Sequence, residues 1–174
     1  MCGITGKLYF SGNERVLQEE IHQMNERIKH RGPDDEGIFI SPKGNIGLGH
    51  RRLSIIDITS AGHQPMSNED GSVWIIFNGE LYNFQELRLG LEKKGHKFRS
   101  QTDTETILHL YEDYGEDCLK HLAGMFAFAL WDEKKQKLFL ARDRIGKKPL
   151  KYFIGRDFIV FASELKAFLN DVQP

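Results

Sequence analysis

The spacing of apolar residues changes along the chain, and these changes predict strands near both ends with helices between them. Residues Ile4 to Phe10 are apolar and β-branched enough for a first strand. Apolar residues three or four positions apart then run from Leu17 to Ile28 and predict an amphipathic helix, with Asn13 as its N-cap. The Gly- and Pro-containing segment Arg31–Gly37 is expected to form a loop. Further strands are expected at residues 37–41, 46–50 and 73–78.

The second half of the chain begins with two helical patterns and ends in strands. One helix is expected from Asn83, with Glu86 completing a capping box, and another over residues 104–114. A turn is expected at Ile145–Pro149 and a short helix from Ser163. Strands are expected at Met125–Trp131, Leu138–Arg142, Tyr152–Ile154 and Phe158–Ala162.

Together these elements predict a layered α+β fold. Strands at both ends enclose helices, without the regular strand–helix alternation of a doubly wound parallel sheet. The segments Trp74–Phe77 and Phe126–Leu130 are apolar on both faces, as expected for strands that are covered on both sides. The chain contains no repeat and no Gly/Ser-rich or Pro-rich linker, so a single domain over residues 1–174 is expected.

Composition and charge exclude several classes of function. The 174 residues include 24 Lys and Arg against 25 Asp and Glu, a balance without a basic footprint for nucleic acid or anionic lipid. The longest apolar run, Leu122–Trp131, is about half of a membrane span, and no signal-peptide pattern begins the chain. Cys2 and Cys118 do not suggest a disulfide framework, and Cys118 is expected in the core. We therefore expect a cytoplasmic protein that binds neither nucleic acid nor membrane.

The start Met1-Cys2-Gly3 carries the first candidate chemistry. Methionine aminopeptidases tolerate a small second residue, so removal of Met1 should leave Cys2 with a free α-amine. An α-amine has a pKa of about 7.7–8.0 and is partly unprotonated at neutral pH, so it can accept a thiol proton. Cys2 would then supply both nucleophile and base, as in N-terminal threonine hydrolases. Taken alone, a cysteine at this position is a weak indication of catalysis.

Other polar residues have a structural as well as a chemical interpretation. Asn78-Gly79 is commonly a hairpin turn, but an Asn amide beside a backbone N–H can also stabilise an oxyanion. Asp103 occupies a position where a helix N-cap is expected, and Thr102 or Thr104 could cap the helix instead.

The histidines and glycines predict neither a metal site nor a nucleotide site. His30, His50 and His63 lack the spacing of metal ligands, and the Glu105–His109 pair is expected on a solvated helix face. No segment matches the phosphate-binding pattern Gly-x-x-x-x-Gly-Lys-Ser/Thr. Neither a metal nor a cofactor is therefore expected in this domain.

Seven short motifs occur in a fixed order along the chain. They are Cys2-Gly-Ile-Thr-Gly6, Arg31-Gly-Pro-Asp34, Arg52-Leu-Ser-Ile-Ile-Asp57, Gly62-His-Gln-Pro65, Asn78-Gly-Glu-Leu-Tyr-Asn83, Thr102-Asp-Thr-Glu105 and Arg142-Asp-Arg-Ile-Gly146. This order resembles the N-terminal glutaminase domain of glutamine-dependent asparagine synthetases, within the class II glutamine amidotransferases, which are N-terminal nucleophile (Ntn) hydrolases. The resemblance covers essentially the full length, and it is closer to asparagine synthetase than to glucosamine-6-phosphate synthase or glutamine phosphoribosyl-amidotransferase.

The resemblance implies a role for each matching residue. Cys2 is implied as the nucleophile, with the Asn78 side-chain amide and the Gly79 backbone N–H as oxyanion donors. Arg52, rather than Arg51, matches the arginine that binds the substrate carboxylate, because it directly precedes Leu-Ser-Ile. The implied substrate-binding residues are Arg52, Ile55, Ile56, Glu80 and Asp103, of which Asp103 and Glu80 would hold the α-ammonium group.

The family also implies a fold and a reaction. The fold would be a four-layer α/β/β/α sandwich of two mainly antiparallel sheets. The reaction would be hydrolysis of L-glutamine to glutamate and ammonia through a Cys2 thioester, supplying ammonia to an ATP-dependent asparagine synthetase-type reaction. ATP and Mg²⁺ are expected only in the C-terminal synthetase domain, which we expect this chain to lack. That domain would act in cis or as a separate acceptor enzyme, and a homodimer of the full-length enzyme is compatible with the resemblance.

Two other classes of function stay open at this point. One is an Ntn amidase or acylase acting on a different amide. The other is a catalytically silent interaction domain, which would result if Met1 were retained. Lys151 stands where an aromatic residue is common in the family, and Ile145 replaces a frequent Phe. Both departures concern the acceptor half more than glutamine hydrolysis, so the ammonia acceptor is not determined.

Overall fold

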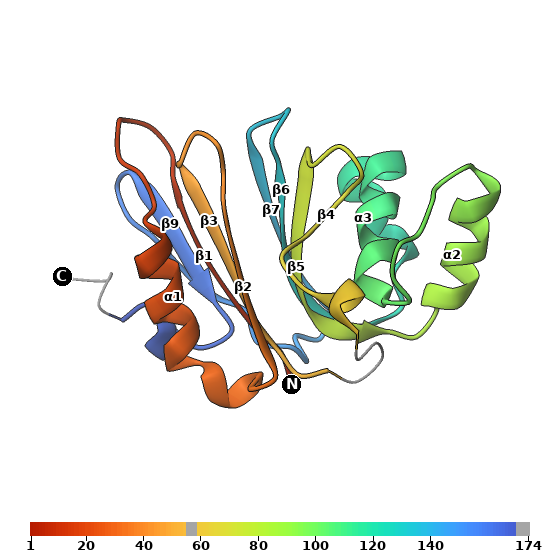
Figure 1. Cartoon of the computed structure of the whole chain (residues 1–174), viewed down its shortest axis with the longest axis horizontal. Coiled ribbons are helices and arrows are strands. Elements are labelled where there is room, and N and C mark those ends of the chain that lie inside the picture. Colours follow the sequence, from red (N-terminus) through yellow and green to blue (C-terminus); the bar gives the residue numbers. More distant parts are fainter. Residues whose placement is uncertain (55–58, 170–174) are drawn as a thin grey trace.

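The computed structural model describes residues 1–54 and 59–169 and contains two antiparallel sheets that face one another (Figure 1). The first sheet has the strand order β2-β3-β1-β9-β8, and the second has the order β4-β5-β6-β7. The first sheet consists of β1 (Gly3–Tyr9), β2 (Asp35–Ile40), β3 (Ile46–Arg52), β8 (Lys151–Ile154) and β9 (Phe158–Ala162). The second consists of β4 (Met66–Ser67), β5 (Val73–Leu81), β6 (Gly124–Asp132) and β7 (Lys137–Arg142).

Helices cover the outer face of each sheet. Helix α1 (Gln18–Arg27) lies on the first sheet, and α3 (Asp103–Tyr114) lies on the second with α2 (Phe84–Lys93) beside it (Figure 1). Short 3-10 helices are η1 (Lys29–Arg31), η2 (Ser60–Gly62), η3 (Gly115–His121) and η4 (Leu165–Ala167). This arrangement confirms the expected four-layer α/β/β/α sandwich.

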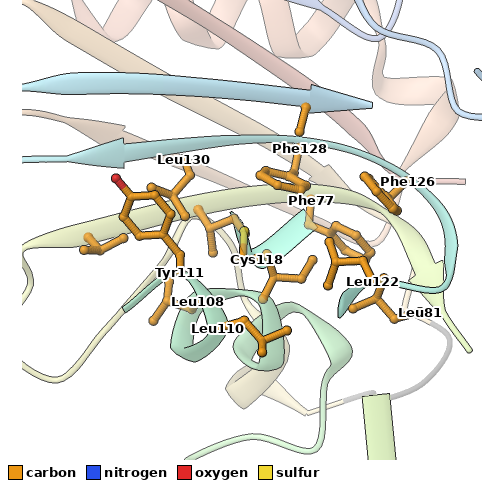
Figure 2. Packing of buried hydrophobic residues seen from close by; sticks show 14 of the residues in the cluster. Phe77, Leu81, Leu108, Leu110, Tyr111, Cys118, Leu122, Phe126, Phe128 and Leu130 are labelled. Carbon is orange, nitrogen blue, oxygen red and sulfur yellow. The ribbon is translucent and has the colours of Figure 1, made fainter. Parts of the chain in front are cut away.

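The central strands are buried on both faces because each lies between the opposite sheet and a helix. Ile76 of β5 packs between the sheets with Ile4 and Phe161, and all three are 0% exposed. Its neighbour Phe77 points the other way, towards α3, together with Phe128 of β6 (Figure 2). Each such side chain contributes about 1.5–3 kcal/mol when fully buried. The alternation explains why these segments are apolar at successive positions.

Two predicted helix caps are wrong. Helix α1 begins at Gln18 with Leu17 as its N-cap, because the Glu20 carboxylate accepts the Leu17 N–H at 2.8 Å, and Asn13 lies outside the helix. Asn83 does stand at the N-cap of α2, but its side chain makes no capping hydrogen bond. It instead donates to the His121 carbonyl at 2.9 Å and accepts the Ala123 N–H at 3.1 Å, which ties α2 to the approach to β6.

Other element predictions differ mainly at their ends. Strand β5 continues through Leu81 rather than stopping at residue 78, so Asn78-Gly79 lies inside a strand opposite Ala127 and Phe126 and is not a hairpin turn. Strand β4 was not predicted, and the helix expected from Ser163 is reduced to η4. Cys118 is fully buried in the cluster beneath α3, which confirms it as a core thiol (Figure 2).

The helices of the described residues are all too short or too polar to cross a lipid bilayer.

Candidate active site

A cavity of about 330 Å³ opens where the N-terminus, the end of β3, the end of β5 and the start of α3 meet. Its volume is near the lower end for small-molecule sites. It is lined by all the predicted site residues that the structure describes: Cys2, Arg52, Asn78, Gly79, Glu80 and Asp103. Ile55 and Ile56 lie outside the described residues.

The Cys2 thiol is positioned by the end of strand β3. Its Sγ accepts the Leu53 N–H at 3.4 Å and lies 3.7 Å from the Leu53 carbonyl oxygen. On the other side, the Arg31 Nε donates to the Cys2 carbonyl at 3.0 Å. Met1, which precedes the nucleophile, is 57% exposed. Leu53 therefore holds the side chain of Cys2 and Arg31 holds its backbone carbonyl, while the residue in front of it is accessible for removal.

The Arg31–Asp34 motif fastens the two segments that carry Cys2 and Arg52. Besides holding Cys2, Arg31 forms an ion pair of 2.9 Å with Glu164. The Gly32 carbonyl accepts the Arg51 Nε at 3.0 Å, and the Asp34 carboxylate accepts the Ser54 N–H at 2.8 Å. This loop therefore acts on the site through positioning rather than by lining the cavity.

Asn78 and Gly79 lie on β5, directly beside the cavity. The Asn78 side chain is 1% exposed, and its Nδ2 has no hydrogen-bond partner among the described residues. Buried polar atoms rarely lack a partner, because an unpaired donor costs about 1–3 kcal/mol. At Gly79 a β-carbon would come within 2.5 Å of the Met125 carbonyl oxygen on β6. Glycine is therefore required there by the close approach of the neighbouring strand.

Two side chains that the sequence analysis did not assign hold the strand just before Asn78. The His50 Nε2 donates to the Phe77 carbonyl at 3.0 Å, and burial lowers the pKa of His50 to about 4, so the ring is neutral. The side-chain Oε1 of Gln64 accepts the Phe77 N–H at 2.7 Å, and its Nε2 donates to the Thr104 hydroxyl at 3.1 Å. His50 thus links the two sheets at the position that orients Asn78.

Arg52 and Arg51 have different environments, although they are adjacent in β3. Arg51 is engaged away from the cavity, with an ion pair of 3.0 Å to Glu36. Arg52 lines the cavity, is 7% exposed, and donates from NH1 to the Thr59 carbonyl at 2.9 Å. A β-carbon at Gly62 would overlap the Arg52 guanidinium, which explains the glycine in that motif. Of the two adjacent arginines, the geometry therefore favours Arg52 as the one that faces the cavity.

Asp103 and Glu80 supply the acidic side of the cavity. Asp103 is the first residue of α3 rather than its cap, because the Thr102 hydroxyl accepts the Glu105 N–H. Its carboxylate is 5% exposed and accepts the Leu81 N–H at 2.9 Å. Burial, with a smaller effect from the charge of Glu80, raises the pKa of Asp103 to about 6. A cationic group bound there would favour its ionised form.

Lys148 also lines the cavity and was missed by the sequence analysis. It is 6% exposed, and its Nζ lies 3.3 Å from the Met1 sulfur. The Asp143 carboxylate fixes the backbone there by accepting the N–H groups of Lys147 and Lys148 at 2.8 and 3.0 Å. The turn at 145–149 was recognised, but a turn pattern contains no information about which cavity a lysine enters.

The cavity suits nucleophilic attack on the amide of a small zwitterion. It combines a thiol, a buried amide donor, one arginine, one lysine and two carboxylates. Among the described residues, the only group of His, Cys, Asp and Glu with the spacing of metal ligands is His96, His109 and Glu112, and none of these lines the cavity.

Comparison with known proteins assigns the chain to a family whose chemistry agrees with this cavity. Residues 1–174 match the family described as the glutamine amidotransferase domain. The chain is 45% identical to glutamine-hydrolyzing asparagine synthetase 1 of Bacillus subtilis and 44% identical to glutamine-hydrolyzing asparagine synthetase 2 of Oryza sativa, covering 99% of this chain in each case. It is also 40% identical to the amidase chry2 of Gibberella zeae over 97% of this chain. It spans 28%, 29% and 26% of these proteins respectively.

A solved structure has the same fold. Glutamine phosphoribosylpyrophosphate amidotransferase from B. subtilis, complexed with ADP and GMP, superimposes with a TM-score of 0.82 at 25% identity. The match covers 96% of this chain and 43% of that one. The chain therefore belongs to the glutamine amidotransferase domain family and has the Ntn-hydrolase sandwich fold. Within that family, the relatives it matches along almost its whole length include glutamine-hydrolysing asparagine synthetases.

Proposed function

We propose that this domain hydrolyses L-glutamine to glutamate and ammonia, with Cys2 as the nucleophile after removal of Met1. The observation that carries the proposal is the Asn78 amide, which is buried, lines the same cavity as the thiol, and lacks a hydrogen-bond partner among the described residues. An oxyanion that forms during amide hydrolysis would accept a hydrogen bond from the Asn78 Nδ2. Family membership supports the choice of glutamine as substrate.

The reaction has two covalent stages. The α-amine of Cys2 takes the thiol proton, and Sγ attacks the γ-carbonyl carbon of glutamine. The C=O electron pair moves onto oxygen, which the Asn78 Nδ2 and the Gly79 N–H stabilise. When the intermediate collapses, the C–N bond breaks and the protonated amine supplies a proton to the departing ammonia. The amine then activates water, which cleaves the γ-glutamyl thioester and regenerates Cys2.

The charged residues of the cavity select an amino acid. The Arg52 guanidinium would bind the α-carboxylate, a role suited to a planar donor. Asp103, assisted by Glu80, would bind the α-ammonium group, whose positive charge also favours the ionised form of Asp103. Ile55 and Ile56 are proposed to line the same pocket. Together these anchors require both charged groups of a free amino acid, which argues against peptides and acylated amines.

In a full-length protein the ammonia would be consumed by an ATP-dependent asparagine synthetase-type reaction. This chain spans only 28% and 29% of the two curated relatives named asparagine synthetases, and their names support this assignment. A synthetase domain, in cis or as a separate enzyme, would bind ATP and Mg²⁺, while residues 1–174 form the glutaminase domain without a cofactor of their own. A reducing compartment such as the cytoplasm would keep the Cys2 thiol active.

An ammonia-release assay with a substrate panel tests the proposal. We expect Met1-free protein, verified by intact mass, to release ammonia from L-glutamine in preference to asparagine, N-acetylglutamine and glutamine amide. Protein that retains Met1 should be inactive, because its Cys2 nitrogen is held in a peptide bond and cannot accept a proton. Equal rates on N-acetylglutamine would instead indicate an amidase of other specificity, and no activity in Met1-free protein would indicate a silent domain.

A further inference from the structure

A second cluster of side chains, with the atom types that bind metal ions, lies away from the active-site cavity on helix α3 and the loop before it. His96 belongs to the loop between α2 and α3, whereas His109 and Glu112 are one turn apart on α3. One ligand atom from each residue can be chosen so that all three lie within 4.8 Å of one another. The sequence analysis missed this group because it considered only the Glu105–His109 pair, which it expected on a solvated face. Both residues of that pair are in fact about 98% buried.

The three residues converge on a single carboxylate oxygen. The Glu112 Oε2 lies 2.7 Å from the His109 Nδ1 and 3.5 Å from the His96 Nδ1. With bonds of about 2.0–2.2 Å, tetrahedral coordination separates neighbouring ligand atoms by about 3.3 Å. Of the two separations from Glu112, the one to His96 is close to that value, and the one to His109 reaches it after a small movement of the Glu112 carboxylate. Glu112 is on the accessible side of the cluster, with its side chain 24% exposed.

The other polar atoms of His96 and Glu112 form hydrogen bonds with residues outside the cluster. The His96 Nε2 donates to the Asp113 carboxylate at 3.0 Å, and the Glu112 Oε1 accepts from the Asn68 amide at 2.8 Å. His109 is 1% exposed and packs edge-on against Phe98, with ring centroids 4.7 Å apart. Metal-binding histidines and carboxylates typically have such outer partners, which fix ring orientation and tautomer.

The second ring nitrogen of His109 also fits a metal ion bound to Nδ1. Its Nε2 is buried and has no hydrogen-bond partner among the described residues, while the nearest carboxylate oxygen, on Glu105, is 3.9 Å away. When the ring proton is on Nδ1 and is donated to Glu112, Nε2 is an acceptor that receives no hydrogen bond from the described residues. A metal ion on Nδ1 would displace that proton and leave the Nε2–H tautomer, with its N–H available to Glu105.

We propose that His96, His109 and Glu112 bind a divalent transition-metal ion, with zinc as the expected occupant and water in the fourth position. Two imidazole nitrogens and one carboxylate oxygen suit Zn²⁺, Co²⁺ or Ni²⁺, whereas Mg²⁺ and Ca²⁺ prefer all-oxygen ligands. On binding, the His109 proton passes from Nδ1 to Nε2, so the ring stays neutral and no net proton is released. The ion would fasten the α2–α3 loop to α3, the helix whose first residue is Asp103, and would therefore stabilise the fold without taking part in hydrolysis.

Cobalt and zinc titrations test this site directly. Untagged Cys2→Ala protein is used, because this variant removes the accessible thiol, which would bind either metal itself. We expect Co²⁺ to give a saturable visible absorption band at one ion per chain, and Zn²⁺ to displace it and raise the Tm, with EDTA reversing both effects. His96→Ala and Glu112→Gln should each abolish the band and the Tm increase, while Ca²⁺ and Mg²⁺ should cause neither.

His22→Ala is the matched control. His22 also pairs with a carboxylate, Glu36 at 3.0 Å, but belongs to no such cluster within residues 1–54 and 59–169, so its replacement should leave metal binding unchanged. Binding that survives both His96→Ala and Glu112→Gln, or that is lost equally in His22→Ala, would contradict the proposed ligands. Absence of saturable binding in folded Cys2→Ala protein would identify the cluster as a hydrogen-bond network only. None of these outcomes depends on glutaminase activity.

Discussion

At the scale of single residues, Asn78 differs from almost every other buried polar group in the protein, because its donor nitrogen has no partner among the described residues. The surrounding structure nevertheless holds it firmly. His50 and Gln64 bind the carbonyl and the N–H of Phe77, the residue before it. A group that is held rigidly and left unpaired is prearranged for a charge that exists only during reaction.

Asn78→Ala should therefore reduce kcat by about 10²–10³-fold, or about 2.7–4 kcal/mol of transition-state stabilisation, with little change in KM. Steady-state ammonia release measures both constants. Asn45→Ala provides a control, since the Asn45 side chain bonds to Ser41 and does not line the cavity. A KM effect without a kcat effect in Asn78→Ala would assign this side chain to substrate binding instead.

Arg52→Lys should chiefly raise KM, because a lysine keeps the charge but loses the planar pair of donors for the α-carboxylate. Arg51→Lys is the matched control. Arg51 bonds to Gly32 and Glu36, so its replacement should affect the unfolding free energy and leave KM near the wild-type value. If the two variants showed the reverse pattern, Arg51 would be the carboxylate-binding residue.

Asp103 should make stability and substrate binding depend on pH in opposite directions. Its folded-state pKa is raised from 3.8 to about 6, so its protonated form is favoured by folding. That stabilisation is complete below pH 3.8 and is lost as pH rises through about 6, a difference of about 3 kcal/mol. Glutamine binding needs the ionised form, so KM should rise as pH falls through 6.

Asp103→Asn separates these effects. At pH 7.5 the variant should be more stable than wild type in urea denaturation and should have a greatly increased KM, because the amide is neutral. Glu80→Gln is the control and should change stability little, since Glu80 is exposed. A less stable Asp103→Asn would show that the hydrogen bond to Leu81 outweighs the removal of a buried charge.

The ordered motifs predicted which residues lie together in one cavity better than local rules did. Asn78-Gly79 is a common turn sequence, yet tertiary pairing of β5 with β6 keeps it in a strand. His50 could not be assigned from the sequence, because it acts through the backbone of Phe77 on the opposite sheet. Gln64 could not be assigned for the same reason, because it also acts through the backbone of Phe77.

At the scale of elements, the hydrophobic pattern predicted the existence of most strands and helices, while their ends depended on particular contacts. Helix α1 begins where Glu20 satisfies the Leu17 N–H, and no propensity rule identifies that choice in advance. Strand β4 has only two residues and no apolar periodicity of its own. The apolar character of both faces of β5 and β6 did predict strands enclosed between two layers.

Phe128→Ala tests this enclosed packing. Phe128 belongs to the buried cluster beneath α3 and is 0% exposed, so its truncation should cost about 3–5 kcal/mol of unfolding free energy (Figure 2). Chemical denaturation followed by circular dichroism gives this value. Phe10→Ala is the control, because Phe10 is 51% exposed and should lose little. Similar losses in both variants would contradict the described core.

At the scale of the whole molecule, sequence patterning alone predicted a layered α+β domain, and the family resemblance supplied the four layers. The face-to-face arrangement of two sheets depends on contacts between residues far apart in the chain, such as Ile4, Ile76 and Phe161. The same arrangement brings the N-terminus, β3, β5 and α3 to one cavity. The chain spans 28% of asparagine synthetase 1 of Bacillus subtilis, so the acceptor reaction belongs to the proposed function and not to these residues.

The central claim is that Cys2 is the covalent nucleophile, and trapping tests it most directly. Met1-free wild type is incubated with a glutamine-like electrophile, and its intact mass, peptide map and ammonia release are measured beside those of Cys2→Ala. We predict one label per chain, on Cys2 and not on the buried Cys118, with complete loss of hydrolysis, and neither label nor activity in Cys2→Ala. Full activity in Cys2→Ala, or inactivation by a label on another residue, would contradict the mechanism.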